Sequence, residues 1–206
     1  MTANHQAGAS LIEMMVAVTI VAILTILAVP NYAAWLQNNR IRTAAESLVD
    51  GLNLARAEAV RRNTAVRFDL VSTLTSGCTL SGSPKAWVVA RGNPSGACDR
   101  NAAAQTDTAV ATAADPKIIQ KANVADSAGS TVINAVNSAS SGATSVVFDG
   151  TGRVSTASIA TMVSRISLSN PAVAAEARPL DVRITVGGQV RLCDPNVTDR
   201  TDPRAC

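Results

Sequence analysis

Histidine, lysine and aromatic residues are scarce in this chain of 206 residues, and each scarcity excludes a kind of chemistry. The one histidine, His5, precedes a long apolar run, so a chain cut ahead of that run has no histidine for a triad, metal site or proton shuttle. The lysines Lys85, Lys117 and Lys121 form no GK[ST] phosphate loop, and no carboxylate pair stands out. We therefore predict no catalytic residue, no cofactor and no enzymatic activity.

The composition also indicates what the core is made of. Two Phe, two Trp and one Tyr are too few rings to fill it, so Val, Ile, Leu and Ala must. Val, Ile and Thr favour strands, which predicts a β-rich domain over residues 64–206. That domain holds thirteen Lys or Arg against eleven Asp or Glu, a balance of +2 that is not typical of a nucleic-acid binder.

The chain has no CxxC motif, and its cysteines are Cys78, Cys98, Cys193 and Cys206. A structural zinc needs four thiolate or imidazole ligands, usually in close pairs, so the spacing favours disulfides and no metal, with zinc as the alternative. Disulfides indicate an oxidising compartment. Four cysteines permit three connectivities. Sequence order favours Cys78–Cys98 and Cys193–Cys206, each worth about 3 kcal/mol in the chain-entropy model.

An apolar run occupies residues 11–29 with a single charge, Glu13, near its start. Its length of about 19 residues is close to the roughly 20 that a helix needs to cross a bilayer. Pro30 is expected to bend or break the helix. A helical apolar stripe then resumes; its members are Ile41, Ala45, Leu48, Leu52, Ala55 and Ala59.

These patterns predict one helix from about Leu11 to Arg62, with residues 9–29 in the membrane and an amphipathic half over residues 30–63. Charges four apart, Arg42 with Glu46 and Glu58 with Arg62, are expected to pair along it. Gly51 is a weak point, since glycine costs roughly 1 kcal/mol inside a helix.

The strands that we predict lie at residues 64–71, 86–90, 116–124, 131–136, 145–148, 159–168, 180–186 and 189–193. The clearest is LDVRITV at residues 180–186, which alternates strictly. A two-residue turn at Gly187 and Gly188 is expected to join it to QVRLC as a hairpin. The sequence FDGTGRV, from Phe148, is expected to form a second hairpin corner.

The N-terminus resembles the prepilin cleavage motif of type IV pilins and type II secretion pseudopilins, on Gly8, then ASLIE, then the apolar run. The resemblance implies that a prepilin peptidase removes residues 1–8, cutting between Gly8 and Ala9, and that Ala9 becomes N-methylated. It also implies that Glu13 docks against the N-terminal amine of a neighbouring subunit. The usual first residue of the mature family is Phe, and here it is Ala9.

The stretch LVDGLNLARAEAVRRNTAVR from Leu48, with FDGTGRV and ITVGGQVRLC, resembles the GspH/FimT/FimU group of minor pilins. This implies an α+β type IV pilin fold, a long N-terminal transmembrane helix packed on an antiparallel β-sheet domain. It also implies a minor pilin that joins a tip or initiation complex with other minor pilins and the major pilin. Its location would be the inner membrane, single-pass with a periplasmic C-terminal domain, and then the pilus.

Two alternatives share this motif and fold. One is a type II secretion minor pseudopilin of the GspH type, which neighbouring genes or a deletion phenotype would distinguish. The other is a minor pilin that binds DNA for natural transformation, through Arg191, Arg200 and Arg204. Three aspartates lie among these arginines and offset their charge, so DNA ranks behind protein partners.

Overall fold

The computed structural model describes residues 10–103, 109–124, 130–171, 177–199 and 201–206, with the side chains of residues 26–31 left out. The chain divides into two compact units, Met1–Leu36 and Gln37–Cys206. A single helix, α1 (Leu11–Arg62), begins in the first unit and ends in the second. The predicted helix boundaries are therefore confirmed.

The C-terminal end of α1 has a defined stop. Asn63 adopts a left-handed conformation with φ 48°, which asparagine tolerates better than most residues. The Asn63 N–H then donates to the Val60 carbonyl and the Thr64 N–H to the Ala59 carbonyl, both at 3.2 Å. These two bonds form a Schellman motif, which satisfies carbonyls that the helix would otherwise leave unpaired. The chain leaves the helix here to enter the first strand.

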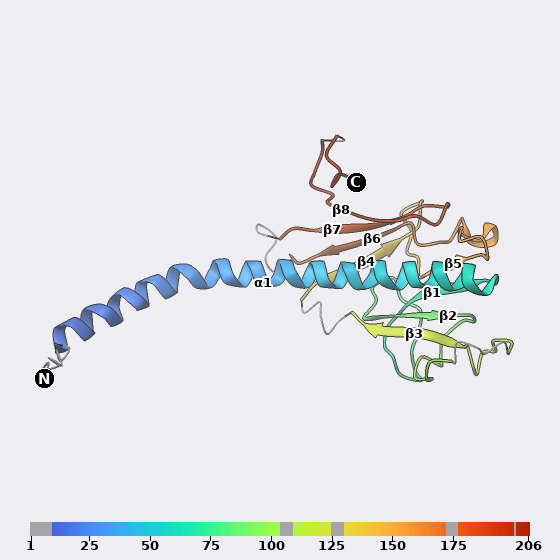
Figure 1. Ribbon diagram of the computed structural model, residues 1–206, viewed down its shortest axis with the longest axis horizontal. Helices are drawn as coiled ribbons and strands as arrows, with labels where there is room; N and C mark the ends of the chain where they lie inside the picture. Colours follow the sequence, from blue (N-terminus) through green and yellow to red (C-terminus); the bar gives the residue numbers. More distant parts are fainter. Residues whose placement is uncertain (1–9, 104–108, 125–129, 172–176, 200) are drawn as a thin grey trace, which may run out of the picture. The chain divides into compact units, whose positions relative to one another are not determined.

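Among the described residues of the unit Gln37–Cys206, eight strands form two four-stranded antiparallel sheets (Figure 1). The first sheet has the order β3-β2-β1-β5 and the second has the order β4-β6-β7-β8. Their bounds are β1 (Val66–Val71), β2 (Ala86–Ala90), β3 (Ile118–Asn123), β4 (Val132–Val136), β5 (Ser145–Phe148), β6 (Arg165–Ser169), β7 (Leu180–Ile184) and β8 (Val190–Cys193). The predicted α+β class, a long helix packed on antiparallel sheet, is confirmed.

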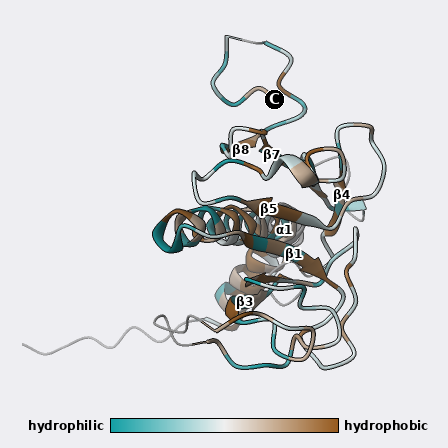
Figure 2. Ribbon diagram, turned by 90° about the vertical axis from the view of Figure 1, so that its right-hand side faces the viewer, coloured by the Kyte–Doolittle hydropathy of each residue, from teal (hydrophilic) through white to brown (hydrophobic). Residues whose placement is uncertain are grey.

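The main core lies between the C-terminal half of α1 and both sheets, and Figure 2 shows the hydrophobic stretch of β1 beside the helix. The helix contributes one fully buried face: Ile41, Ala44, Ala45, Leu48, Leu52, Ala55 and Ala59. Small alanines on this face let the helix backbone approach the sheets. The rings of Phe68 and Trp87 stack with centroids 5.8 Å apart, and the Trp87 indole donates to Ser47 Oγ at 3.0 Å. The predicted apolar stripe is thus the docking face of the helix.

The two central strands of the first sheet, β1 and β2, are buried on both faces. Every residue of β2 is buried, which explains why its sequence AWVVA does not alternate. A second apolar cluster covers the face turned away from the main core and includes Val71, Val88 and Ile118. The disulfide Cys78–Cys98 lies within this cluster. The loops around this disulfide therefore cover the outer face of the first sheet.

Two details of the strands differ from the prediction. The strand expected at residues 159–168 begins only at Arg165, because the Ser158 carbonyl accepts bonds from Thr161 and Met162 that coil the chain ahead of it. The hairpin between β7 and β8 pairs as expected, but its turn differs. Three residues, Val186, Gly187 and Gly188, lie between Thr185 and Gln189, where two were expected. Thr185 bonds to Gln189, and Gly188 takes the left-handed position with φ 80°.

The packing around Gly51 explains why a glycine occupies this position in the helix. A Cβ at Gly51 would lie 2.8 Å from Phe68 Cε2 and 3.0 Å from Trp87 Cδ2. The helix therefore accepts the propensity cost of glycine because only a hydrogen atom fits between its backbone and the two rings.

We predict that Gly51→Ala destabilises the protein although alanine is the better helix former. Overpacking costs about 1–3 kcal/mol, which outweighs a propensity gain of about 1 kcal/mol. Gly77→Ala is the matched control, because nothing lies within 4 Å of the added Cβ there. Urea unfolding of both variants in a nonionic detergent measures the difference. Equal or higher stability of Gly51→Ala would contradict the close approach.

Candidate assembly site

The N-terminal part of α1 is an apolar surface with nothing of its own unit covering it. All side chains from residue 11 to residue 25 are exposed, among them Leu11 at 77% and Ile12 at 70%. The two hydroxyls in this stretch are satisfied internally, since Thr19 donates to the Val16 carbonyl and Thr25 to the Val21 carbonyl. A segment with its polar groups paired and its apolar groups exposed suits a lipid or protein environment.

Glu13 is the one charge in that surface, and it lies in the first turn of α1. A carboxylate there is favoured by the positive end of the helix dipole. The predicted cleavage and methylation residues, Gly8 and Ala9, lie outside the described residues. The structure therefore locates Glu13 but leaves its relation to Ala9 as a prediction.

Across the described part of the chain, no helix is both long and apolar enough to cross a membrane. The assignment of residues 9–29 to the membrane stays a prediction. The adjoining rings of Tyr32 and Trp35 stack with centroids 5.8 Å apart, and both are exposed.

The four cysteines form two disulfides, Cys78–Cys98 and Cys193–Cys206, with Cα atoms 6.0 Å and 5.1 Å apart. This is the pairing that sequence order favours. The second bond closes the C-terminal tail onto β8, where Asp194 N–H also donates to the Arg204 carbonyl at 2.7 Å. Within the ranges that the structure describes, no group of three or more His, Cys, Asp or Glu side chains is arranged to hold a metal.

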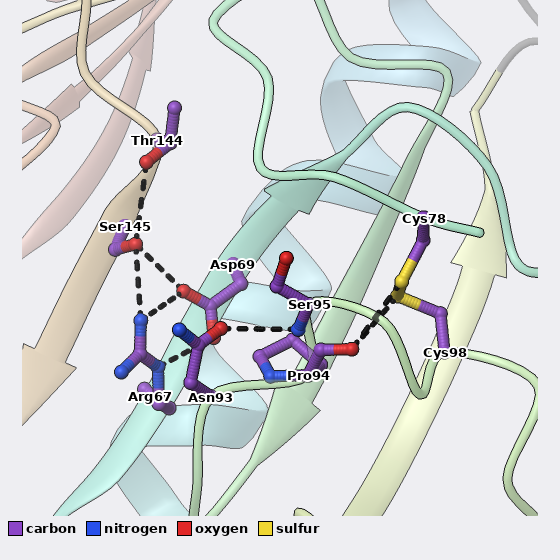
Figure 3. Close-up of polar contacts among 9 residues, drawn as sticks. All are labelled: Arg67, Asp69, Cys78, Asn93, Pro94, Ser95, Cys98, Thr144 and Ser145. Carbon is purple, nitrogen blue, oxygen red and sulfur yellow. Dashed lines mark hydrogen bonds and ion pairs between the residues drawn. A yellow bond between two sulfur atoms is a disulfide. The ribbon is translucent and has the colours of Figure 1, made fainter. Parts of the chain in front are cut away.

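A buried ion pair in the first sheet was not anticipated from the sequence. The Arg67 guanidinium donates to both oxygens of Asp69, at 2.6 and 2.7 Å, and Ser145 Oγ donates to Asp69 Oδ1 at 2.6 Å (Figure 3). Asp69 is fully buried. Burial raises the pKa of its carboxyl above the ordinary value, although the bonds from Arg67 and Ser145 act in the opposite direction. The alternation Arg67-x-Asp69 in a strand is the signal that placed both on one face.

The arginines considered for nucleic acid are largely engaged within the protein. Arg204 pairs with Asp202 at 2.6 Å, which lowers the pKa of Asp202 to about 2. Arg191 Nη2 donates to backbone oxygens of Ala205 and Cys206. Arg200 lies outside the described residues.

The arginines near the end of α1 are likewise held. Arg56 Nε donates to the Gly152 carbonyl at 3.0 Å, while Arg61 and Arg62 both bind Glu58 at 2.7 Å. Of the predicted helix pairs, Glu58 with Arg62 and Arg42 with Glu46 are confirmed, the latter at 2.8 Å.

Comparisons with known proteins agree with this arrangement. The family described as Type II transport protein GspH matches residues 44–198, and the family described as Prokaryotic N-terminal methylation motif matches residues 3–29. No curated protein matches. A long N-terminal helix on antiparallel sheets, preceded by an N-terminal methylation motif, defines the pilin class of proteins. Since the first match covers more than half of its length, the chain belongs to the GspH family.

Two solved structures are similar to the chain, both of the type IV minor pilin FimU from Pseudomonas aeruginosa strain PAO1. One is 14% identical with a TM-score of 0.45 and covers 79% of this chain and 97% of FimU. The other, a second crystal form, is 13% identical with a TM-score of 0.44 and covers 75% and 97%.

We predict opposite pH responses for two aspartates. The raised pKa of Asp69 means that its contribution to stability is present below the ordinary carboxyl range and is lost as pH rises through the folded pKa. Asp149 has a lowered pKa, chiefly because Thr151 Oγ1 donates to it, so its contribution is lost as pH falls.

Urea unfolding of the wild type, Asp69→Asn and Asp149→Asn at a series of pH values tests both signs. Relative to Asp69→Asn, the wild type is expected to lose stability as pH rises from the acid range. Relative to Asp149→Asn, it is expected to lose stability as pH falls. If both stability differences changed in the same direction with pH, burial would not be the dominant influence on the pKa of Asp69.

Proposed function

We propose that this protein is a minor pilin that joins a tip or initiation complex of a type IV pilus and supports filament assembly. The observation that carries the proposal is the exposed apolar surface of α1 with the single charge Glu13, in a chain of the GspH family. Such a surface has to be covered in the mature protein. Lipid covers it first and neighbouring subunits cover it later.

In this proposal residues 9–29 anchor the chain in the inner membrane, and residues 64–206 form a periplasmic domain. The prepilin peptidase cuts between Gly8 and Ala9, and the new N-terminus at Ala9 is methylated. The subunit then passes into the pilus beside other minor pilins and the major pilin. The two disulfides suit the oxidising periplasm and cell surface.

Glu13 supplies the specificity of docking. A lone carboxylate at membrane depth costs about 2–3 kcal/mol on insertion scales, so a partner that neutralises it stabilises the assembled state. The amine of Ala9 in a neighbouring subunit has the opposite charge. Pairing is therefore favourable only when the two helices align in register.

A type II secretion pseudopilin is the second candidate, and the match to the family of the type II transport protein GspH favours it. Both candidates use the same anchor, cleavage motif and docking charge. Deletion of the gene, followed by twitching, secretion and transformation assays on the same strain, separates them. Loss of twitching alone supports the pilus, whereas loss of secretion alone supports the pseudopilin.

DNA binding is the third candidate and ranks behind the other two. Arg191 and Arg204 donate to groups within the protein, which lowers the cationic surplus that phosphate binding needs. A gel shift at low salt decides the point, and micromolar binding would reverse the ranking.

We predict that Glu13→Ala leaves membrane insertion and cleavage intact but lowers incorporation into filaments. The loss is expected to be about tenfold or more, because a hydrogen bond between charged groups is worth roughly 1.5–3 kcal/mol. Quantitative immunoblots of sheared filaments and of membranes measure it. Glu46→Ala is the control, since Glu46 forms an exposed pair with Arg42 far from the motif and such pairs contribute little. Equal incorporation of the two variants would contradict a docking role for Glu13.

We also predict that Gly8→Leu blocks processing. Mass spectrometry of the wild-type protein is expected to find a chain that begins at N-methylated Ala9, whereas the variant keeps residues 1–8. Cleavage at another position would show that the cut does not lie between Gly8 and Ala9.

A further inference from the structure

Three arginines form a row across the second sheet. Arg165 on β6 is the direct partner of Arg183 on β7, and Arg183 is the direct partner of Arg191 on β8. Side chains at paired positions of an antiparallel sheet project from the same face. Like charges directly opposite each other destabilise a sheet. A row of this kind therefore lowers the stability of the sheet, and the fold does not require it.

The row lines a cleft of about 570 Å³ on the face opposite the main core. Its other polar lining residues carry hydroxyl or amide groups, among them Asn137 and Gln189. Clefts of roughly 300–1,000 Å³ are the usual size for a small ligand or a short peptide segment. The cleft thus combines concentrated positive charge with neutral hydrogen-bonding groups in a bounded space.

The arginines retain capacity for an anion. Arg183 Nη2 pairs with Asp181 at 3.2 Å, but Arg183 Nε is buried and, among the described residues, has no hydrogen-bond partner. Arg191 Nη2 is occupied by the backbone oxygens of Ala205 and Cys206. The groups that the row already binds are thus a carboxylate and peptide carbonyls.

We propose that this cleft binds an acidic peptide segment of a partner protein, with an Asp or Glu carboxylate against Arg165 and Arg183. Guanidinium groups hold carboxylates through paired N–H donors, and the amide and hydroxyl lining suits a peptide main chain. The inference goes beyond the filament role and does not depend on it.

Charge around the cleft favours a peptide over a nucleic acid. Asp181 is buried in the same sheet and pairs with Arg183. Its carboxylate already offsets one of the three cations, so the cleft suits one further carboxylate better than a polyanion. Nucleic-acid binding also needs several uncompensated cations.

The experiment is calorimetric titration of the full-length protein in a nonionic detergent. The probes are an acetylated, amidated hexapeptide of Ser and Gly with one central Glu, the matched hexapeptide with Gln in place of that Glu, and a single-stranded oligonucleotide. The variants are Arg165→Gln, Arg183→Gln and, as a control with the same change in charge, Arg100→Gln on an exposed loop.

The acidic peptide is expected to bind, and each cleft variant is expected to weaken it about tenfold or more. The Gln peptide is expected not to bind. Arg100→Gln is expected to bind the Glu peptide as the wild type does. Thermal unfolding of Arg165→Gln is expected at an equal or higher temperature than the wild type, because the variant relieves the like-charge row. This readout shows that lost binding is not lost folding.

Three results would overturn the proposal. One is an acidic peptide that does not bind the wild type. Another is an equal loss of binding in Arg100→Gln. The third is arginine-dependent binding of the oligonucleotide without the peptide, which would make the cleft a nucleic-acid site. Filament assembly enters none of these measurements, so they stand or fall separately from the proposed function.

Discussion

At Gly51 the helix α1 comes so close to the rings of Phe68 and Trp87 that a methyl group would not fit between them. This close approach connects the helix to the first sheet, and the alanines along the same face extend it over both sheets. Burial of apolar side chains is the dominant favourable term in folding, and this face contributes seven fully buried residues to it. The strands need residues 41–59 of the helix as one wall of their core, so this half of α1 cannot be removed without exposing that core.

The two sheets share the inner wall but differ on their outer faces. The outer face of the first sheet is sealed by loops, the disulfide Cys78–Cys98 and the buried pair Arg67–Asp69. The outer face of the second sheet is open and carries the row of three arginines. A sealed face contributes stability, whereas a charged open face is available for recognition. The exposed surfaces that remain are residues 11–25 of α1 and the outer face of the second sheet.

Much of the fold was predictable because it depends on local patterns. The extent of α1, the alternation of β7 and the order of the cysteine pairs all follow from spacing along the chain. Glu13, to which we assign a docking role by proposal, was equally visible as the one charge in an apolar run. The late start of β6 was missed because hydrogen bonds from the Ser158 carbonyl override the strand preference of its neighbours.

The long helix, the N-terminal methylation motif and the α+β class could all be inferred from the sequence, because each depends on the order and spacing of neighbouring residues. The burial of Asp69 against Arg67 and the row formed by three arginines became evident from the three-dimensional arrangement alone. The three arginines are far apart in the chain. Their alignment depends on strand order and register, which arise from long-range pairing and packing that local spacing does not encode.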